Sequence, residues 1–178
     1  MTTPTPYTIG PADTECRYPV LLNGNFLGLV FRWHRAWFAI PAGITNPDGT
    51  ETEIRISAGS IGKDAAARYL CDEFAAGRIA PAQKAPAPRS ETRTGRIPLL
   101  HRRMDKPQNH EAAYRALRGL EALRWIPLGG YPGADNPWLM RCQLCNWTGV
   151  RYWSHLRGRK GAPPTPYRHP GCTGRQAL

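Results

Sequence analysis

Two short pairs of metal-ligand residues near the C-terminus constrain this chain more than any other feature. Cys142 and Cys145 form a Cys-x2-Cys pair, and after 23 intervening residues His169 and Cys172 form a His-x2-Cys pair. Three thiolates and one imidazole are the donor set of a closed tetrahedral zinc site, with sulfur about 2.3 Å and nitrogen about 2.0 Å from the metal. We therefore expect these four residues to bind Zn2+ and to shape a segment too small for a core of its own.

The residues around both pairs favour tight metal-binding turns. Asn146 follows the first pair, where such a turn needs a left-handed backbone, and Pro170 and Gly171 bend the chain inside the second pair. Two other interpretations stay open: a redox Cys-x2-Cys, which would need a strand-to-helix context that the pattern lacks, and chance pairing in a loop-rich tail. His155 is a competing imidazole, but it has no neighbouring cysteine, so His169 is the preferred ligand.

The other cysteines and the hydropathy of the chain indicate a reducing compartment. The chain has 5 cysteines, and Cys16 and Cys71 stand far from the rest, which is not the spacing of a disulfide framework. No run of about 18 apolar residues occurs, and the N-terminus lacks the charged-then-apolar order of a secretory signal. We expect a cytoplasmic protein with no membrane partner.

Charge is distributed unevenly along the 178 residues. Residues 1–76 carry 6 basic and 8 acidic side chains, a net charge of −2, whereas residues 77–178 carry 18 basic and 5 acidic side chains, a net charge of +13. A Cys3His zinc centre has a formal charge of −1, because three thiolates outweigh the +2 of the metal, and leaves this half strongly positive. A basic half indicates a polyanionic partner, nucleic acid before an anionic membrane surface.

The N-terminal half has the pattern of a small antiparallel sheet with one packed helix. Residues 1–15 are rich in Thr and Pro and predict a flexible leader before a domain over residues 16–78. A hairpin turn is expected at Asn23–Gly24, and Gly77 ends a helix that is capped at Ser60. The expected strands cover residues 18–22, 26–33, 36–40 and 51–57.

The Asn23–Gly24 turn, Trp37 in the third run and the helix opening Lys63–Ala67 resemble the arm-binding domains of tyrosine recombinases and AP2-type DNA-binding domains. This resemblance covers about 60 residues and implies a ββα-type unit. Trp33 and Trp37 are expected in the core or on the sheet face, because a small sheet needs aromatic area, rather than as a platform for bases. Since this half has a net charge of −2, it is not expected to be the main nucleic-acid contact, and it equally suits a protein partner.

Residues 79–108 predict a linker between two modules. Residues 80–88 are rich in Ala and Pro and should be extended, and residues 89–103 hold five arginines and one acid, which suits either a solvated linker or a phosphate-contacting arm. Asn109 caps an expected helix from His110 to about Arg124, which opens the last module, residues 109–178. The expected fold is therefore α+β.

A series of short motifs runs through residues 117–174. They are Gly119–Leu123, Tyr131–Ala134, Pro137–Trp138, Arg141–Cys145 and Tyr152–Arg157. Together they resemble the treble-clef or zinc-ribbon domains of small actinobacterial and actinophage proteins, which suggests such an origin. The resemblance implies zinc ligands at Cys142, Cys145 and Cys172 and contact with nucleic acid. His169 stands where the family normally has cysteine, which makes the affinity for zinc more dependent on pH.

Cations and aromatic side chains alternate around the ligand pairs, as the recognition of phosphates and exposed bases requires. Trp138 and Trp153 are expected to pack around the metal instead of stacking on bases. The predicted nucleic-acid contacts are Arg141, Trp147, Arg151, Tyr152, Arg157, Arg159, Lys160 and Arg168.

No catalytic constellation accompanies these residues. A four-ligand zinc site has no open position for water, and the candidate bases His101, His110 and His155 have no paired carboxylates in the sequence. We predict a non-enzymatic protein that binds nucleic acid, DNA in preference to RNA. The alternatives are an interaction adaptor of a phage or mobile element, whose N-terminal domain binds a protein, and a metal-dependent nuclease.

Overall fold

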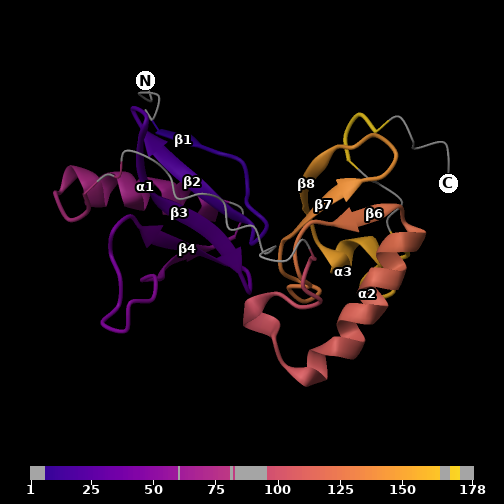
Figure 1. Cartoon of the computed structure of the whole chain (residues 1–178). Helices are drawn as coiled ribbons and strands as arrows, with labels where there is room; N and C mark the ends of the chain where they lie inside the picture. The colour runs from indigo at the N-terminus through magenta and orange to yellow at the C-terminus, as the bar shows by residue number, and fades with distance from the viewer. Residues whose placement is uncertain (1–6, 60, 81, 83–95, 165–168, 173–178) are drawn as a thin grey trace. The chain divides into compact units, whose positions relative to one another are not determined.

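The computed structural model describes residues 7–59, 61–80, 82, 96–164 and 169–172. The chain forms two compact units, Arg17–Pro88 with Met1–Ala12, and Arg89–Leu178 with Asp13–Cys16. In the described residues, the first unit has a five-stranded antiparallel sheet with helix α1, and the second has a three-stranded sheet with α2 and α3 (Figure 1). The predicted α+β class is confirmed.

The strands of the first sheet lie side by side in chain order. They are β1 (Tyr7–Ile9), β2 (Arg17–Leu22), β3 (Asn25–Trp33), β4 (Ala36–Pro41) and β5 (Ile54–Ala58). Asn23 and Gly24 join β2 to β3 with positive φ angles of 51° and 82°, as a two-residue hairpin turn requires. The predicted hairpin is therefore confirmed.

Strand β1 corrects the prediction of a flexible leader over residues 1–15. Tyr7, Thr8 and Ile9 pair antiparallel with Leu22, Leu21 and Val20 of β2. Composition identified the segment as Thr- and Pro-rich, but the backbone partner that orders it is supplied by a strand further along the chain. Residues 1–6 lie outside the described residues.

Helix α1 (Gly62–Ala75) packs against one face of this sheet and closes the main core of the first unit (Figure 1). The Trp37 side chain is 8% exposed in that core, and Trp33 packs at the edge of a second apolar cluster, as expected. Gly77 ends the helix with a φ of 71°, and the Arg78 N–H donates to the Glu73 carbonyl at 2.9 Å, which completes a Schellman motif.

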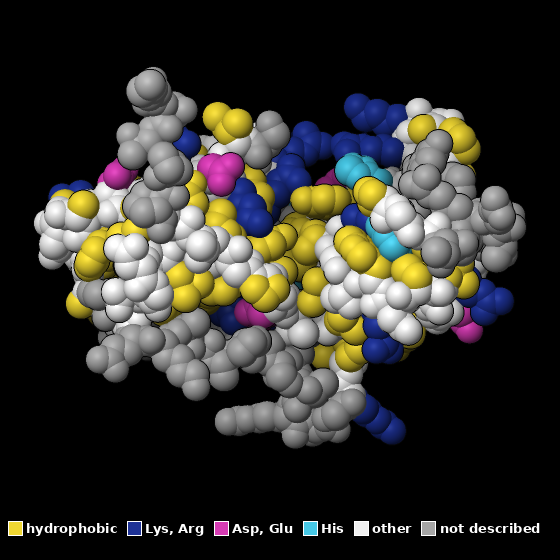
Figure 2. All heavy atoms as spheres, turned by 90° about the horizontal axis from the view of Figure 1, so that it is seen from above, with side chains coloured by type: hydrophobic (Ala, Val, Ile, Leu, Met, Phe, Trp, Pro, Cys, Tyr) yellow, Lys and Arg dark blue, Asp and Glu magenta, His cyan; other side chains and the backbone are white. Residues whose placement is uncertain are grey.

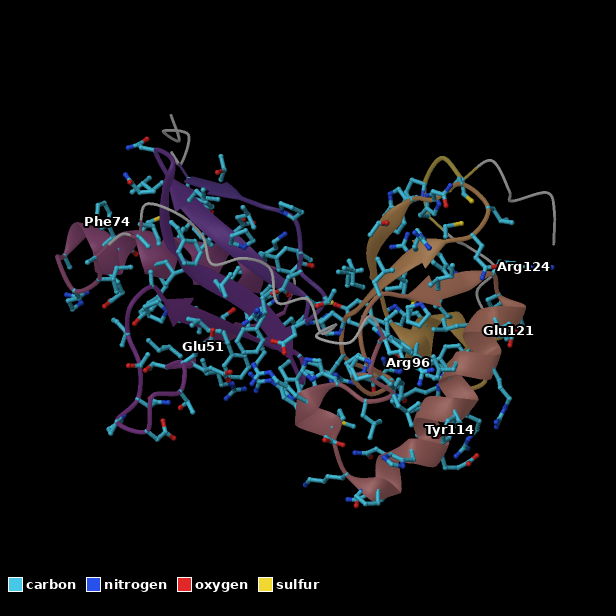
Figure 3. All side chains as sticks on the ribbon, in the orientation of Figure 1. Glu51, Phe74, Arg96, Tyr114, Glu121 and Arg124 are labelled. Atoms are coloured by element: carbon cyan, nitrogen blue, oxygen red, sulfur yellow. The ribbon has the colours of Figure 1, made fainter. Side chains whose placement is uncertain are left out.

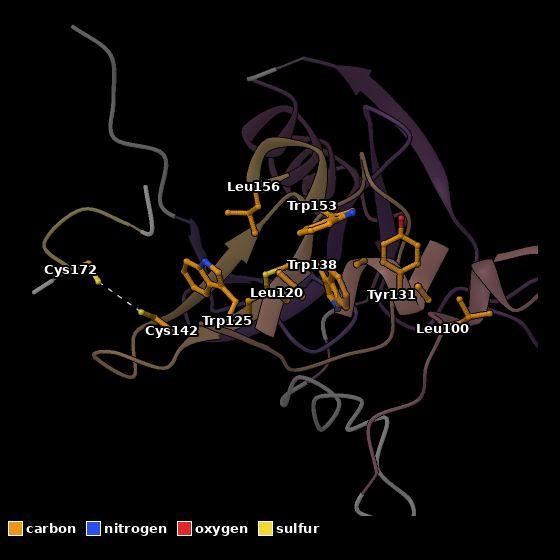
Figure 4. Close-up of a cluster of buried hydrophobic side chains, with 12 residues drawn as sticks. Leu100, Leu120, Trp125, Tyr131, Trp138, Cys142, Trp153, Leu156 and Cys172 are labelled. Atoms are coloured by element: carbon orange, nitrogen blue, oxygen red, sulfur yellow. Dashed lines mark hydrogen bonds between the residues drawn. The ribbon is translucent and has the colours of Figure 1, made fainter. Parts of the chain in front are cut away.

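The second unit packs α2 on the β6–β8 sheet. Its elements are the 3-10 turns η1 (Arg102–Met104) and η2 (Pro107–Asn109), then α2 (His110–Ala122), β6 (Trp125–Pro127), β7 (Trp138–Cys142), β8 (Thr148–Arg151) and α3 (Trp153–Leu156). The core gathers Trp125, Trp138 and Trp153 around Leu120 (Figure 4). Trp138 and Trp153 are 2% and 9% exposed, so both have the packing role that the sequence predicts.

The end of the predicted linker belongs to this core. Leu100 is 6% exposed, and its neighbours pair with Tyr131: the His101 N–H donates to the Tyr131 carbonyl and the Tyr131 N–H to the Leu99 carbonyl, both at 3.0 Å. Gly130 allows this approach, because a Cβ there would lie 2.4 Å from the Leu100 carbonyl carbon. Two leucines in a basic run carry too little pattern to reveal this pairing, and residues 83–95 of the linker lie outside the described residues.

The start of α2 differs in detail from the prediction. Asn109 occupies the N-cap position, but its side chain makes no capping bond and donates instead to the Met104 carbonyl at 2.8 Å. The side-chain amide therefore ties α2 to the preceding η1 turn. The helices in the described part of the chain are too short and too polar to cross a lipid bilayer.

Candidate metal centre

Strands β7 and β8 carry the first ligand pair on the turn that joins them. Cys142 is the last residue of β7, and its N–H donates to the Trp147 carbonyl at 2.8 Å. The Asn146 N–H donates to the Cys142 carbonyl at 2.9 Å, and the Asn146 φ of 60° lies in the left-handed region. The left-handed Asn146 that the sequence predicts is confirmed, and the turn brings both thiols to one side.

The second pair lies on another tight turn, which faces the first (Figure 4). The Cys172 N–H donates to the His169 carbonyl at 3.3 Å across Gly171, whose φ is 74°. His169 and Cys172 are 4% and 5% exposed. Both donors are therefore withdrawn from solvent although their turn comes from the last part of the chain.

The four donor atoms converge on one point. All of them lie within 4.8 Å of one another: the Cys142 and Cys145 sulfurs are 3.8 and 3.9 Å from the Cys172 sulfur, and the Cys145 sulfur is 3.0 Å from His169 Nε2. Metal–donor distances typical of zinc imply about 3.8 Å between two sulfurs and about 3.5 Å between sulfur and nitrogen in a tetrahedron. The sulfur separations match these values, and the sulfur–nitrogen separation is shorter. The donor set and its spacing therefore fit a tetrahedral ion.

The ring of His169 is oriented by its surroundings. Its Nδ1 lies 3.0 Å from the Pro170 carbonyl oxygen, so the tautomer with hydrogen on Nδ1 donates there and leaves the Nε2 lone pair for a metal. The Trp147 ring stacks on the imidazole, with 4.5 Å between centroids and 11° between planes, and Trp125 meets both rings edge-on at 6.2 Å. The hydrogen bond to Pro170 and the stacking on Trp147 therefore fix the orientation of the His169 ring.

The pKa values of the two thiols of the first pair are shifted in opposite directions. Burial raises the pKa of Cys142, but the Leu144 N–H and the His169 ring stabilise its thiolate and bring the pKa down to about 6. For Cys145 the Trp147 N–H lowers the pKa, whereas burial and the neighbouring sulfurs raise it, and the net shift is upward. A cation would reverse this upward shift, because thiolates that repel one another are neutralised by coordination.

The residues predicted to contact nucleic acid differ in their exposure and in their side-chain contacts. Arg141, Arg157 and Lys160 are exposed. Tyr152 lies with its ring 5.1 Å from that of His155, which is exposed and outside the donor cluster, and Arg159 lies 3.4 Å from Asp135. Arg168 lies outside the described residues. In the space-filling view, Lys and Arg side chains are visible on the surface beside hydrophobic and other uncharged atoms (Figure 2).

Trp147 and Arg151 have partners inside the metal centre. The Arg151 guanidinium carbon lies 4.4 Å from the Trp147 ring centroid and 5.6 Å from that of Trp125. Burial lowers the pKa of Arg151, and the Cys142 thiolate opposes that shift. The contacts of these two side chains with bases or phosphates stay predictions, because packing around His169 accounts for their positions.

Sequence reasoning missed the cations of α2 and of the turn that follows it. Arg115, Arg118 and Arg124 are exposed, and the outer side of α2 also carries Tyr114 and Glu121 (Figure 3). A shallow depression of about 380 Å³ at the end of the helix is lined by Arg118, Glu121, Ala122 and Arg124. The sequence could have indicated these residues, because they are spaced along the side of the helix opposite its buried apolar residues.

Comparisons with protein-family models, curated proteins and solved structures found no match to this chain. The resemblances to treble-clef or zinc-ribbon domains and to AP2-type or arm-binding domains therefore stay predictions. The Cys3His cluster itself is compatible with a zinc-binding module.

Proposed function

We propose that the second unit holds Zn2+ in a structural Cys3His site. The observation that carries the proposal is the convergence of four donor atoms from two tight turns within 4.8 Å. Thiolate and imidazole donors suit Zn2+, whereas Mg2+ and Ca2+ prefer oxygen. Because the protein supplies four ligands, the ion would join the β7–β8 turn to the C-terminal turn and leave no open position for a substrate.

Metal content tests this assignment. Protein purified without added zinc should contain about one equivalent of Zn2+ by mass spectrometry, and Cys142→Ala and His169→Ala should each lose most of it. Cys71→Ala is the matched control, since Cys71 is half-buried in the first unit and outside the cluster. Full metal content in both ligand variants would contradict the proposal.

We propose further that this protein binds nucleic acid, DNA in preference to RNA, and is not an enzyme. The net charge of +13 over residues 77–178 supports a polyanionic partner. Arg141, Arg157 and Lys160 offer exposed cations for phosphates in the unit that carries the metal centre. Trp147 and Arg151 are not needed for this contact, because Trp147 already packs on His169 and Arg151 packs on Trp147.

Fluorescence anisotropy tests the proposal. It measures binding to labelled duplex DNA, and to RNA of the same sequence, at increasing salt concentration. The logarithm of the binding constant should fall linearly with the logarithm of salt concentration, by about 0.9 for each phosphate neutralised on a duplex. Joint substitution of Arg141, Arg157 and Lys160 by Ala should lower the slope by up to about 2.7 on this scale.

A charge-matched control separates local contacts from bulk charge. Joint substitution of Arg35, Arg55 and Arg68 by Ala removes three exposed cations from the first unit and should leave the slope unchanged. A wild-type binding constant that does not change with salt concentration would favour the alternative of a protein-binding adaptor. Cleavage of plasmid with Mg2+ or Mn2+, lost in His155→Ala, would contradict the non-enzymatic proposal.

A further inference from the structure

Trp147, which precedes β8, and two residues of β8 form a continuous surface. Trp147, Gly149 and Arg151 are spaced by two residues, and side chains at that spacing in an extended chain point the same way. A Cβ on Gly149 would lie 2.0 Å from Cη2 of Trp147, so the indole lies across the glycine. The Arg151 guanidinium carbon lies over the Trp147 ring, 4.4 Å from its centroid.

The same indole touches a predicted metal ligand. Trp147 stacks on His169 at 4.5 Å with an angle of 11°, so one ring contacts both the imidazole and the guanidinium. Arg151 is half-buried, and its Nη1 donates to the Val150 carbonyl at 3.0 Å, which holds the cation near the strand. An arginine used only for phosphate contact would not need this packing.

The negative charge of a zinc-loaded Cys3His site explains why a cation would pack here. Three thiolates around Zn2+ leave a formal charge of −1, and a cation that shares its partly desolvated surroundings lowers the free energy of that charge. We propose that Arg151 is a positioning residue of the metal centre, which offsets the excess negative charge of the Cys3His donors and keeps Trp147 packed on His169. The inference rests on the proposed zinc site and removes Arg151 from the phosphate contacts.

Competition for Zn2+ with a chromophoric chelator tests this role in the full-length protein. Arg151→Gln should weaken zinc binding about 10- to 100-fold, as loss of an outer-shell partner typically does. Arg151→Lys keeps the charge and should recover part of the affinity, but its ammonium lacks the planar stack. Gly149→Ala leaves every charge in place and should also weaken binding, because the added methyl displaces the indole.

Arg141→Gln is the matched control. Arg141 is exposed and adjacent to Cys142 in β7, so this variant removes an equal charge beside a ligand and should change zinc affinity by less than about twofold. Circular dichroism at saturating Zn2+ checks that each variant folds. At saturating Zn2+, Arg151→Gln should also keep the wild-type salt slope for DNA, because the Arg151 guanidinium packs on Trp147.

The outcomes separate the inference from the proposed function. Wild-type zinc affinity in Arg151→Gln would overturn the positioning role, while loss of metal in Cys142→Ala would still support the zinc site. A lower salt slope in Arg151→Gln at saturating Zn2+ would return Arg151 to the phosphate contacts and overturn the inference. Absence of zinc from the wild type would overturn both.

Discussion

Gly119 illustrates how a residue's backbone preference and its packing can oppose each other. Glycine in the middle of a helix costs about 1 kcal/mol relative to alanine, so local propensity favours alanine in α2. A Cβ at this position, however, would lie 2.1 Å from Cη2 of Trp153, whose side chain is buried in the core. The indole is rigid and surrounded, so packing outweighs propensity here.

We predict that Gly119→Ala destabilises the second unit. The expected loss in the free energy of unfolding is about 1–3 kcal/mol, because the core must shift to admit the methyl group. Denaturant unfolding of the zinc-loaded protein measures it. Ala122→Gly, at the exposed last residue of the same helix, is the control, with an expected loss below about 1 kcal/mol. A variant more stable than the wild type would show that Trp153 moves aside at little cost.

At the scale of elements, the C-terminus of α1 combines a backbone motif with an ion pair. Arg78 follows the Gly77 stop, and its guanidinium donates to both carboxylate oxygens of Glu73 at 2.7 Å. This bond to Arg78 holds the pKa of Glu73 below its usual value, against the weaker opposing effect of burial. The side chain of Arg78 thus continues the connection that its N–H makes to the helix.

Acid should therefore weaken this helix end in a defined direction. Because the folded-state pKa of Glu73 is lowered, the pair stabilises the fold above the usual glutamate pKa, and the contribution is lost as the pH falls through the lowered value. A pH titration by NMR should place the Glu73 midpoint below 4.5, and Arg78→Gln should raise it. Arg68→Gln, an exposed charge on the same helix, is the control, and an unshifted midpoint in Arg78→Gln would contradict the prediction.

At the scale of the molecule, both units have an apolar core, and the second also carries the candidate metal centre. The first unit packs α1 and five paired strands around apolar clusters. In the second unit, the Cys142 and Cys172 side chains are part of the apolar core, and the proposed zinc ion would join the turns that carry them. Structural zinc contributes about 10–16 kcal/mol of apparent binding free energy in comparable peptides, so its loss would remove a large contribution to the stability of the second unit.

Removal of the metal should therefore unfold one unit and spare the other. After treatment with a strong chelator, amide hydrogen exchange should accelerate in β6, β7 and β8 and stay slow in β2, β3 and β4. The untreated Cys142→Ala variant should reproduce this pattern, and Cys71→Ala should not. Equal loss of protection in both units, or in neither, would contradict the prediction.

The sequence by itself determined the features that depend on a few neighbouring residues. Ligand spacing identified the four donors, Asn146 marked a left-handed position, Gly77 marked the end of a helix, and Asn23–Gly24 marked the hairpin. Each of these is encoded within one turn of backbone, where steric preference is strong and no distant partner is needed. The positions of β2 to β5 and of α1 could also be predicted to within a few residues, whereas β1 could not.

Only the tertiary structure decided which distant segments meet. It ordered Tyr7–Ile9 beside β2, paired Leu100 with Tyr131, placed Trp153 over Gly119 and packed Arg151 on Trp147. Such contacts depend on shape and burial across many residues, and similar sequence patterns permit several partners. The sequence alone does not show whether an arginine near a candidate metal ligand is free in solvent or packs on an indole, and the structure places Arg151 on Trp147.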